Sequence, residues 1–498
     1  MFRAAISFAT GLLVARGLGP AGYGDLNFLL GSFVAVQTLV NMGSSNAFFT
    51  LISQRARGGL FYLTYFGWMG LQFAATLLVV AIVIPAEIFE RIWLGHSRGM
   101  VILALLAAFM QQQVWQVVVQ IGESARKTAH VQLLNIGVAI AYLAAVYLIS
   151  VADGISVASM LKLLIVQYLL AALVAYRLLH PRKSETVETV ASVKNIVDEF
   201  WKYCKPLIGF YIAGFLYAFT SNWMLQRFGG ASEQGYFQIA SQFASISLLA
   251  TTSILNIFWK EIAEAAAKAD RARVASLYRK VNRGLVMLNA TIAGFLLPWS
   301  KQIVALLLGP AYTEAWPILA IMFLYPIHQS MGQIGGAMFL AQGDTRRFTV
   351  LSIAILLSIC TPITYFALAP TSGIYIPGFG LGGIGMAGST VLANFLGVIV
   401  QGWFIAGSGG WKFDWLYQAV GIPLIIGLGY SAKMLVGLLW NLEGVGMAHM
   451  VGPVFVASIF YIMFVLSSLW LLPWLIGMDR DEIRGLLRFR NISARRTD

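Results

Sequence analysis

Four basic side chains interrupt runs that are otherwise strongly apolar: Arg16, Lys162, Arg227 and His328. A charge at the centre of a membrane span costs about 3 kcal/mol on insertion scales, so such a side chain usually faces a wet cavity. An anion such as a phosphate is the natural partner, because its oxygens match the geometry of a guanidinium group. The alternatives are snorkelling to the membrane interface for the two arginines and core packing for His328.

Uncharged amides form a second polar set inside the apolar runs. Gln112 and Gln116 lie one helical turn apart, in a stripe that Gln120 continues. Gln333 corresponds to Gln112 in the second half of the chain, and Asn41 adds a further amide. Amides with few charges nearby suit sugar hydroxyls, although hydrogen bonds between helices are the alternative. The predicted substrate-binding residues are therefore Arg16, Arg227, Lys162, His328, Gln112, Gln116, Gln333 and Asn41.

The sequence offers no constellation that would serve an enzyme. Paired carboxylates, nucleophile motifs and metal-ligand spacings do not stand out, and the glycines of residues 378–388 follow no soluble strand. All 21 Asp and Glu residues fall outside the centres of the expected membrane spans. Because ion coupling commonly uses a carboxylate inside the membrane, this distribution also disfavours proton- or sodium-driven antiport. We predict a protein that is not an enzyme and that has no metal or cofactor.

Apolar runs recur from end to end of the 498-residue chain, which is 59% hydrophobic and 11% charged. This pattern predicts an all-α polytopic membrane protein with about 14 transmembrane helices of about 20 residues each. The expected spans lie near 2–18, 26–47, 62–84, 100–121, 131–151, 156–178, 206–228, 235–258, 284–307, 315–340, 348–369, 382–405, 416–437 and 450–475. Most of the 34 Lys and Arg fall on one side of this topology. The positive-inside rule then places both termini in the cytoplasm and explains the net charge of +13 without nucleic acid as a partner.

The chain contains an internal duplication. Residues 15–26 read ARGLGPAGYGDL, and residues 225–237 echo them as LQRFGGASEQGYF. We align Gly19 with Gly229, after which the second copy carries one inserted residue. With about six helices in each half, both halves start from the same side of the membrane, as parallel repeats do. The space between such repeats is the expected site.

The expected organisation has five parts. An amphipathic helix is predicted in the linker, because apolar residues recur at helical spacing from Val193 to Cys204. Residues 260–283 are a second basic amphipathic stretch, which we interpret as a solvated loop of the positive side. The parts are 1–179, an N-lobe with helices 1–6; 180–204, a cytoplasmic linker; 205–407, a C-lobe with helices 7–12; 408–477, helices 13–14; and 478–498, a basic cytoplasmic tail.

The motif at residues 15–20, ARGLGP, followed by Tyr23 and Gly24, resembles the N-terminal motif of the polysaccharide-biosynthesis flippases. These O-antigen and exopolysaccharide exporters form a family of the multidrug/oligosaccharidyl-lipid/polysaccharide (MOP) exporter superfamily. The turns at residues 122–127 and 343–347 look like that family's cytoplasmic turns. Arg16 matches the arginine of the motif, whereas Arg227 is displaced by one position in our alignment of the repeats.

This resemblance implies a flippase for surface polysaccharide biosynthesis in a bacterial cytoplasmic (inner) membrane. It would move polyprenyl-pyrophosphate-linked oligosaccharide from the inner to the outer leaflet, as two six-helix lobes rock about a central cationic cavity that includes Arg16. Its partners would be that lipid-linked glycan and membrane lipids, with other polysaccharide-assembly membrane proteins as further candidates. The alternatives are a lipid II flippase, a drug/cation antiporter of the same fold, and a membrane glycan polymerase or ligase. The last would need a large catalytic outer loop, which the sequence lacks.

Overall fold

The computed structural model describes residues 2–152, 154–179, 192–268, 270–373, 375–442, 447–479 and 482. These residues are almost entirely helical and include no strand, which confirms the predicted all-α class. Helices are expected here because a chain inside a bilayer must satisfy its backbone hydrogen bonds within each segment. Ten of the described helical segments are long and apolar enough to cross a membrane. The chain is therefore a multi-pass membrane protein.

The chain forms two compact units. The first comprises Met1–Ile239 and Ser352–Gly385, and the second comprises Ala240–Leu351 and Met386–Asp498. The helices that begin in the first unit are α1 (Phe2–Asn41), α2 (Ser44–Gln54), α3 (Gly59–Leu78), α4 (Ala86–Trp93), α5 (Arg98–Phe109), α6 (Trp115–Ser124), α7 (Thr128–Ala152), α8 (Val157–Leu179), α9 (Val193–Cys204), α10 (Ile208–Met224), α11 (Ala231–Ser247), α18 (Thr361–Leu368) and α19 (Gly382–Gly409). Those that begin in the second are α12 (Leu249–Ala267), α13 (Arg271–Leu296), α14 (Ser300–Leu307), α15 (Trp316–Met322), α16 (Tyr325–Ala341), α17 (Thr345–Ile355), α20 (Leu416–Leu439) and α21 (Met447–Leu471).

Breaks within helices account for most of the difference between the ten long segments and about 14 expected spans, and α10 accounts for a further one. Gly19 has a non-helical backbone (φ 67°, ψ 175°) that divides α1 into the first two spans. The spans expected near 235–258 and 315–340 are each divided between two shorter helices, α11 with α12 and α15 with α16. Short π-helical turns occur at Val79–Val83, Met110–Val114, Leu225–Gly229 and Leu356–Cys360.

The prediction of a loop at residues 260–283 is wrong, because most of this stretch is helical. The described residues continue α12 to Ala267 and start α13 at Arg271, so this stretch is two helix ends joined by a short turn. Ion pairs support these ends, since Lys268 pairs with Glu264 at 2.7 Å one turn apart in the chain, and Arg273 of α13 pairs with Glu261 of α12 at 2.7 Å. Linker residues 180–191 and most of the tail at 478–498 lie outside the described residues.

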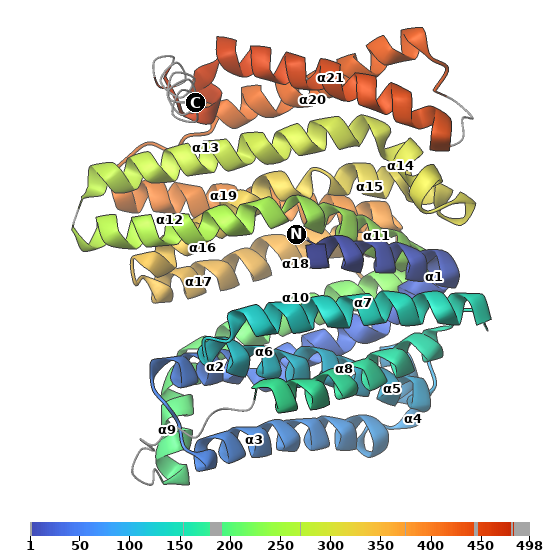
Figure 1. Ribbon diagram of the computed structural model, residues 1–498, viewed down its shortest axis with the longest axis vertical. Helices are drawn as coiled ribbons and strands as arrows, with labels where there is room; N and C mark the ends of the chain where they lie inside the picture. The colour runs from blue at the N-terminus through green and yellow to red at the C-terminus, as the bar shows by residue number, and fades with distance from the viewer. Residues whose placement is uncertain are drawn as a thin grey trace, which may run out of the picture. The chain divides into compact units, whose positions relative to one another are not determined.

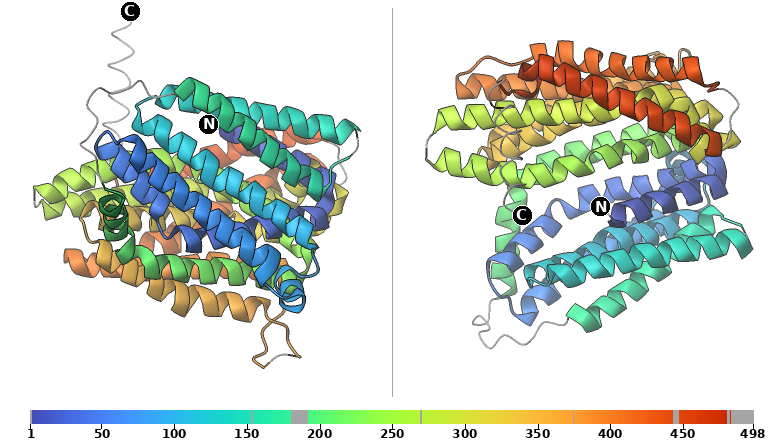
Figure 2. Two further views of the ribbon diagram at one scale, coloured as in Figure 1. Left: turned by 90° about the horizontal axis from the view of Figure 1, so that it is seen from below. Right: turned by 45° about the horizontal axis from the view of Figure 1, so that its top comes forward.

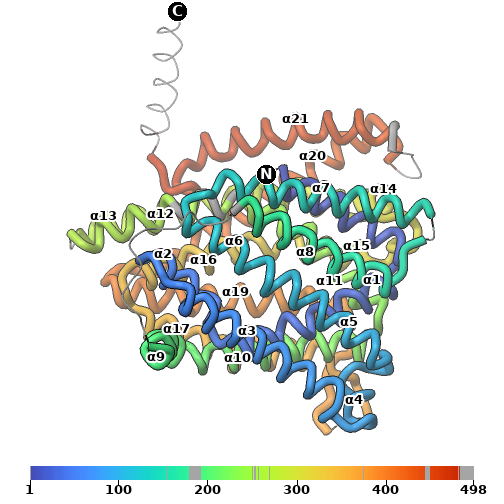
Figure 3. The backbone as a smooth tube through the Cα atoms, turned by 60° about the horizontal axis from the view of Figure 1, so that its bottom comes forward, coloured from blue at the N-terminus to red at the C-terminus, as the bar shows by residue number. Residues whose placement is uncertain are grey.

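The predicted amphipathic helix of the linker is confirmed as α9. Ile196 and Phe200 pack against Phe61 and Tyr65 of α3, and the Phe200 and Tyr65 rings stack at 5.8 Å. Figure 3 views α9 nearly along its axis, whereas α3 runs across the picture. The helix therefore crosses the end of α3, as an amphipathic helix on a membrane surface would.

The last two long helices belong to the second unit. α20 packs along α13, and α21 packs along α20 (Figures 1 and 2). The closest approach is at Gly294 and Gly429, where a Cβ added to Gly429 would lie 1.9 Å from the Gly294 carbonyl oxygen. Lys433 of α20 donates hydrogen bonds to the Pro298 carbonyl (2.6 Å) and to Gln302 Oε1 (3.1 Å). This lysine therefore ties α20 to the turn after α13 and to α14.

Candidate functional site

Two backbone kinks of the same kind lie in the first unit. Gly19 has φ 67° and ψ 175°, and Gly230 has φ 89° and ψ 170°. Only glycine adopts this region readily, so the two residues are structural equivalents. The sequence-based pairing of Gly19 with Gly229 is therefore wrong by one residue, because Gly229 still belongs to the π-helical turn before the kink.

The corrected register pairs Arg16 with Arg227 at an offset of 211 residues, with no insertion. The offset that pairs Gly19 with Gly230 also pairs Gly24 with Gly235, as the sequence already suggested. Each arginine precedes its kink glycine by the same number of residues. Arg227 is therefore the counterpart of Arg16, without the displacement by one position of the sequence alignment.

The two equivalent segments cross each other directly beyond the kinks. A Cβ added to Gly24 would lie 1.8 Å from the Ala231 carbonyl oxygen, and one added to Gly235 would lie 2.1 Å from the Pro20 carbonyl oxygen. Pro20 and Ala231 are themselves equivalent, so the contact is reciprocal. Small residues permit such close helix crossings. The crossing is the structural counterpart of the duplication seen in the sequence.

Polar side chains surround this crossing. Gln226 Nε2 donates to Asp25 Oδ1 at 2.8 Å, and His96 Nε2 lies 3.4 Å from the same oxygen. Asn222 Nδ2 donates to the Phe28 carbonyl oxygen at 3.1 Å, which links α10 to α1. Sequence analysis did not select Asp25, His96 or Gln226, although Asp25 lies inside the repeated motif. These contacts join helices, which fits the alternative role that the sequence left open for buried amides.

Glu233 makes a further contact near the crossing. Its Oε2 accepts a hydrogen bond from the Gly383 backbone N at 2.7 Å, so the carboxylate caps the first turn of α19. A negative charge at a helix N-terminus is favourable because the helix dipole is positive there. The Glu233 carboxylate therefore stabilises the N-terminal end of α19.

Three of the predicted cations, Arg16, Arg227 and Lys162, belong to the first unit. Arg16 and Arg227 are both exposed, each just before its kink. A Cβ on Gly17 would lie 2.4 Å from Ile155 Cδ1, so this end of α1 packs against the start of α8. Lys162 is exposed in the second turn of α8. The two arginines therefore lie close in sequence to the kinks, and the part of Lys162 in a shared site stays a prediction.

The three glutamines of the predicted stripe differ in exposure. Gln112 and Gln116 are exposed, but Gln120 is buried and donates to Ser45 Oγ at 3.0 Å. Gln116 and Gln120 both lie in α6, where four residues turn the helix by about 40° and Gln120 falls among the buried residues, whereas Gln112 lies in the π-helical turn Met110–Val114. Such turns often occur at functional sites, and sequence periodicity gives no signal for them.

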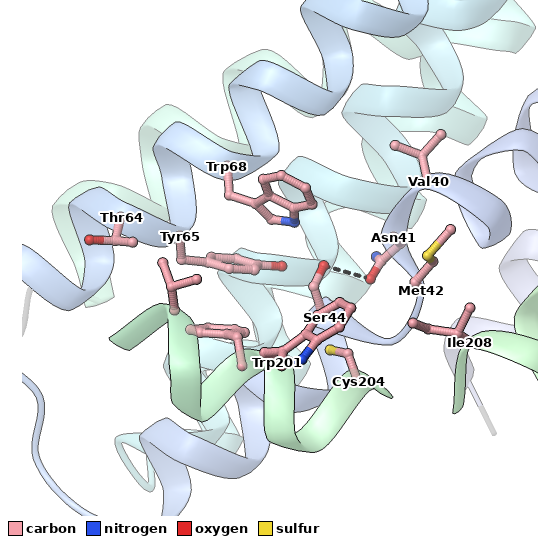
Figure 4. Close-up of a pocket in the computed structure, with 12 residues that line it drawn as sticks. Val40, Asn41, Met42, Ser44, Thr64, Tyr65, Trp68, Trp201, Cys204 and Ile208 are labelled. Carbon is pink, nitrogen blue, oxygen red and sulfur yellow. Dashed lines mark hydrogen bonds between the residues drawn. The ribbon is translucent and has the colours of Figure 1, made fainter. Parts of the chain in front are cut away.

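Asn41 has a local structural role. Its Oδ1 accepts hydrogen bonds from Ser44 Oγ and from the Ser45 backbone N, both at 2.9 Å. It therefore caps the start of α2, where Gly43 has a left-handed backbone. Its side chain also borders a cavity of about 260 Å³ in the first unit, drawn in Figure 4.

His328 and Gln333 both lie on α16, in the second unit. The His328 ring meets Phe395 edge-on at 4.7 Å, and its Nε2 is buried without a hydrogen-bond partner among the described residues. Gln333 Oε1 is also buried and has no hydrogen-bond partner among the residues that the structure describes. Over the described residues, no group of three His, Cys, Asp or Glu side chains could hold a metal ion.

No family model matches the sequence, and no curated protein matches it either. Solved structures do match. The lipid II flippase MurJ in an inward closed conformation superimposes with a TM-score of 0.66 at 13% identity, covering 94% of this chain and 97% of MurJ. An inward-facing multidrug resistance MATE family transporter of the MOP superfamily gives 0.65 at 14% identity, covering 82% of this chain and 94% of that one. A MOP superfamily transporter from Pyrococcus furiosus gives 0.55 at 14% identity, covering 82% and 92%.

The chain has the fold of the MOP superfamily transporters. The similarity to MurJ leaves only a small part of this chain uncovered. That part is shorter than α20 and α21 together, so the match extends into the last pair of helices. The MOP fold thus accounts for both the repeated part of the chain and residues beyond it.

Proposed function

We propose that this chain is a flippase for lipid-linked oligosaccharides. It would translocate polyprenyl-pyrophosphate-linked glycan units from the inner to the outer leaflet of a bacterial cytoplasmic membrane, for surface polysaccharide biosynthesis. The observation that carries the proposal is the pair of equivalent, exposed arginines, Arg16 and Arg227, beside the crossing of the two repeats in a chain of the MOP fold. Two cations in equivalent positions suit a headgroup with two phosphates.

The chemistry follows from the side chains available. Guanidinium groups bind phosphate oxygens through paired, charge-assisted hydrogen bonds, and Lys162 supplies a further cation in the same unit. The exposed amides Gln112 and Gln116 can donate to and accept from sugar hydroxyls. The prenyl chain would stay in the bilayer while the headgroup crosses by alternating access through a cationic cavity. The contacts between the headgroup and the protein must weaken when the lipid is released. Exposed cations allow this better than buried ones, because water can replace the headgroup.

A lipid II flippase is the second candidate. The observation that favours it is the extent of the match to the lipid II flippase MurJ, which covers 94% of this chain against 82% for the MATE transporter. Drug/cation antiport has weaker support. The acidic residues nearest the crossing, Asp25 and Glu233, are engaged with Gln226 and with the first turn of α19. Ion coupling would need a carboxylate that is open to the ion.

The test is leaflet-resolved analysis of lipid-linked glycans in cells depleted of the protein and then resupplied. We expect cytoplasmic-leaflet intermediates of surface polysaccharide to accumulate and then to clear. Accumulation of lipid II alone would establish the second candidate. If neither lipid accumulates and organic cation efflux falls instead, the flippase proposal is wrong.

Substitutions of the cations sharpen this test. Arg16→Ala, Arg227→Ala and Lys162→Ala should each lower the clearance rate about tenfold, since a hydrogen bond to a charged group contributes about 1.5–3 kcal/mol. Arg16→Lys and Arg227→Lys should retain part of the rate, because charge remains while bidentate geometry is lost. Arg3→Ala is the matched control, as Arg3 is also exposed on α1 but lies far from the kink. Unchanged clearance in all three alanine variants at equal protein levels would refute the cationic site.

A further inference from the structure

A second site, separate from the cations, lies where α9 crosses the ends of α1, α3 and α10 in the first unit. It is a cavity of about 260 Å³, and Figure 4 shows its side chains. Nearly all of its lining is apolar: Val40, Tyr65, Trp68, Phe200, Trp201 and Ile208 carry most of it. Of its polar groups, Ser44 Oγ donates to Asn41 Oδ1 at 2.9 Å. The lining therefore suits a hydrocarbon and offers little to a sugar.

The cavity opens between two exposed tryptophans. Trp68 of α3 is 47% exposed and Trp201 of α9 is 55% exposed, whereas Tyr65 and Phe61 beneath them are buried. Tryptophans gather at the level of lipid headgroups, and amphipathic helices lie at the same level. α9 also lies on the side that the charge distribution predicts to be cytoplasmic. The opening of the cavity is thus expected at the boundary between the acyl chains and the headgroups of the membrane.

Three lysines lie in or directly after α9, on the helix arc next to the residues that line the cavity. At about 100° per residue, Lys194 and Lys205 fall about 20° and 40° from Trp201 around the α9 axis. Lys202 extends the same polar arc, and all three lysines are exposed. Asp198 is the acidic residue on that arc. The excess of lysines matches an anionic phosphate above an apolar slot.

The other acidic residue of α9, Glu199, does not offset this charge. Its Oε1 lies 2.7 Å from Arg55 Nη2, and its Oε2 lies 2.9 Å from Arg57 Nη1. The Arg57 guanidinium also stacks over the Phe61 ring at 4.7 Å. Two arginines on one carboxylate hold α9 against the α2–α3 turn, on a different side of the helix from Lys194 and Lys205.

We propose that this cavity binds one acyl chain of an anionic phospholipid, whose phosphate lies on Lys194 and Lys205. The site goes beyond the proposed transport function, because its ligand is a resident membrane lipid and not the transported one. α9 belongs to the linker between the two halves of the chain. The bound lipid would fix that linker helix on the membrane surface.

The experiment uses the full-length protein in phosphatidylcholine vesicles with a minor fraction of phosphatidylglycerol that carries a photoreactive diazirine in one acyl chain. Crosslinks are mapped by peptide mass spectrometry. We expect labelling of the α3 and α9 peptides around Trp68 and Trp201. Lys194→Ala and Lys205→Ala should each reduce it about fivefold, in line with the contribution of one lysine near an anionic surface. Lys260→Ala, at an exposed lysine on α12, is the control that should change nothing.

Two tryptophan substitutions test whether the acyl chain occupies the cavity. Val197 lines the cavity and is 51% exposed, whereas Val193 is 49% exposed on the same helix and does not line it. Val197→Trp should abolish labelling of the Trp68 peptide, and Val193→Trp should leave it intact. The proposal is overturned if Val197→Trp labels normally, or if the phosphatidylcholine analogue labels the cavity as well as phosphatidylglycerol does. Stronger labelling by a polyprenyl phosphate analogue would also overturn it, by making this a site for the transported lipid. None of these outcomes depends on glycan transport.

Discussion

The two kinked segments of the first unit, residues 16–24 and 227–235, share a backbone but not their side-chain contacts. Gly19 and Gly230 take the same dihedral region, and the glycines that follow each of them meet the other segment's backbone reciprocally. Duplicated chains can retain such a crossing because it depends on small residues and backbone geometry, which both copies inherit. The equivalent arginines are retained as well.

The polar contacts at the crossing are different in the two copies. Gln226 of the second segment donates to Asp25 of the first, at 2.8 Å. The reverse bond cannot form between side chains, since Ala15 and Tyr236 occupy the equivalent positions. The crossing is therefore symmetric in its backbone and asymmetric in its hydrogen bonds. This difference indicates that close packing is common to both halves, whereas side-chain bonding has become specific to each.

The crossing glycines should show the largest effect. Gly24→Ala and Gly235→Ala would each place a Cβ within about 2 Å of a backbone carbonyl oxygen, at 1.8 Å and 2.1 Å. The helices would have to separate, at a cost of about 3 kcal/mol or more. We expect both variants to lose folded protein, as measured by tryptophan fluorescence during thermal unfolding in detergent.

Gly67→Ala and Gly70→Ala are matched controls in α3. A Cβ at either position meets nothing within 4 Å. Alanine also favours a helix over glycine by about 0.5–1 kcal/mol, so these variants should be neutral or slightly stabilised. Equal stability of the Gly24 and Gly67 variants would show that the repeats do not cross at these glycines.

The kink glycines should show the next largest effect. Gly19→Ala and Gly230→Ala would force an alanine into a positive-φ region, at about 1–3 kcal/mol each, although neither new Cβ meets another atom within 4 Å. Gly229→Ala should cost less, because Gly229 lies in the helical turn before the kink and its new Cβ would be only slightly crowded, at 3.2 Å from Glu233 Cβ. Thermal unfolding of the three variants distinguishes the two registers. Greater damage at Gly229 than at Gly230 would restore the pairing inferred from the sequence.

The register error shows what sequence could not resolve. Gly229 and Gly230 are adjacent, and either could supply the positive φ of a kink, so a match of Leu18-Gly19 to Phe228-Gly229 was the obvious choice. The π-helical turn Leu225–Gly229 decides the matter by using the first of the two glycines. A π turn depends on how neighbouring helices pack, which residue periodicity does not encode.

Other parts of the prediction depended on strong local signals. The all-α class and the amphipathic helix α9 follow from long apolar runs and from helical spacing, and the structure confirms both. The sequence did not distinguish Gln116 from Gln120, although the first is exposed and the second is buried in the same regular helix α6. Arg16 and His328 lie in different units, so a single site that contains both of them stays a prediction. Their side chains carry no local signal of which partners they meet.

The asymmetric hydrogen bond should show the smallest effect. Gln226→Ala removes the 2.8 Å bond to Asp25, and we expect a loss of about 1 kcal/mol, because the Asp25 side chain is 30% exposed and water can replace the amide. Asp25→Asn should lose less, since an amide oxygen can still accept the bond. The combined Gln226→Ala and Asp25→Asn variant should be no less stable than Gln226→Ala alone, as a double-mutant cycle of thermal unfolding would show. Fully additive losses would mean that Asp25 stabilises the crossing through His96, 3.4 Å away, and not through Gln226.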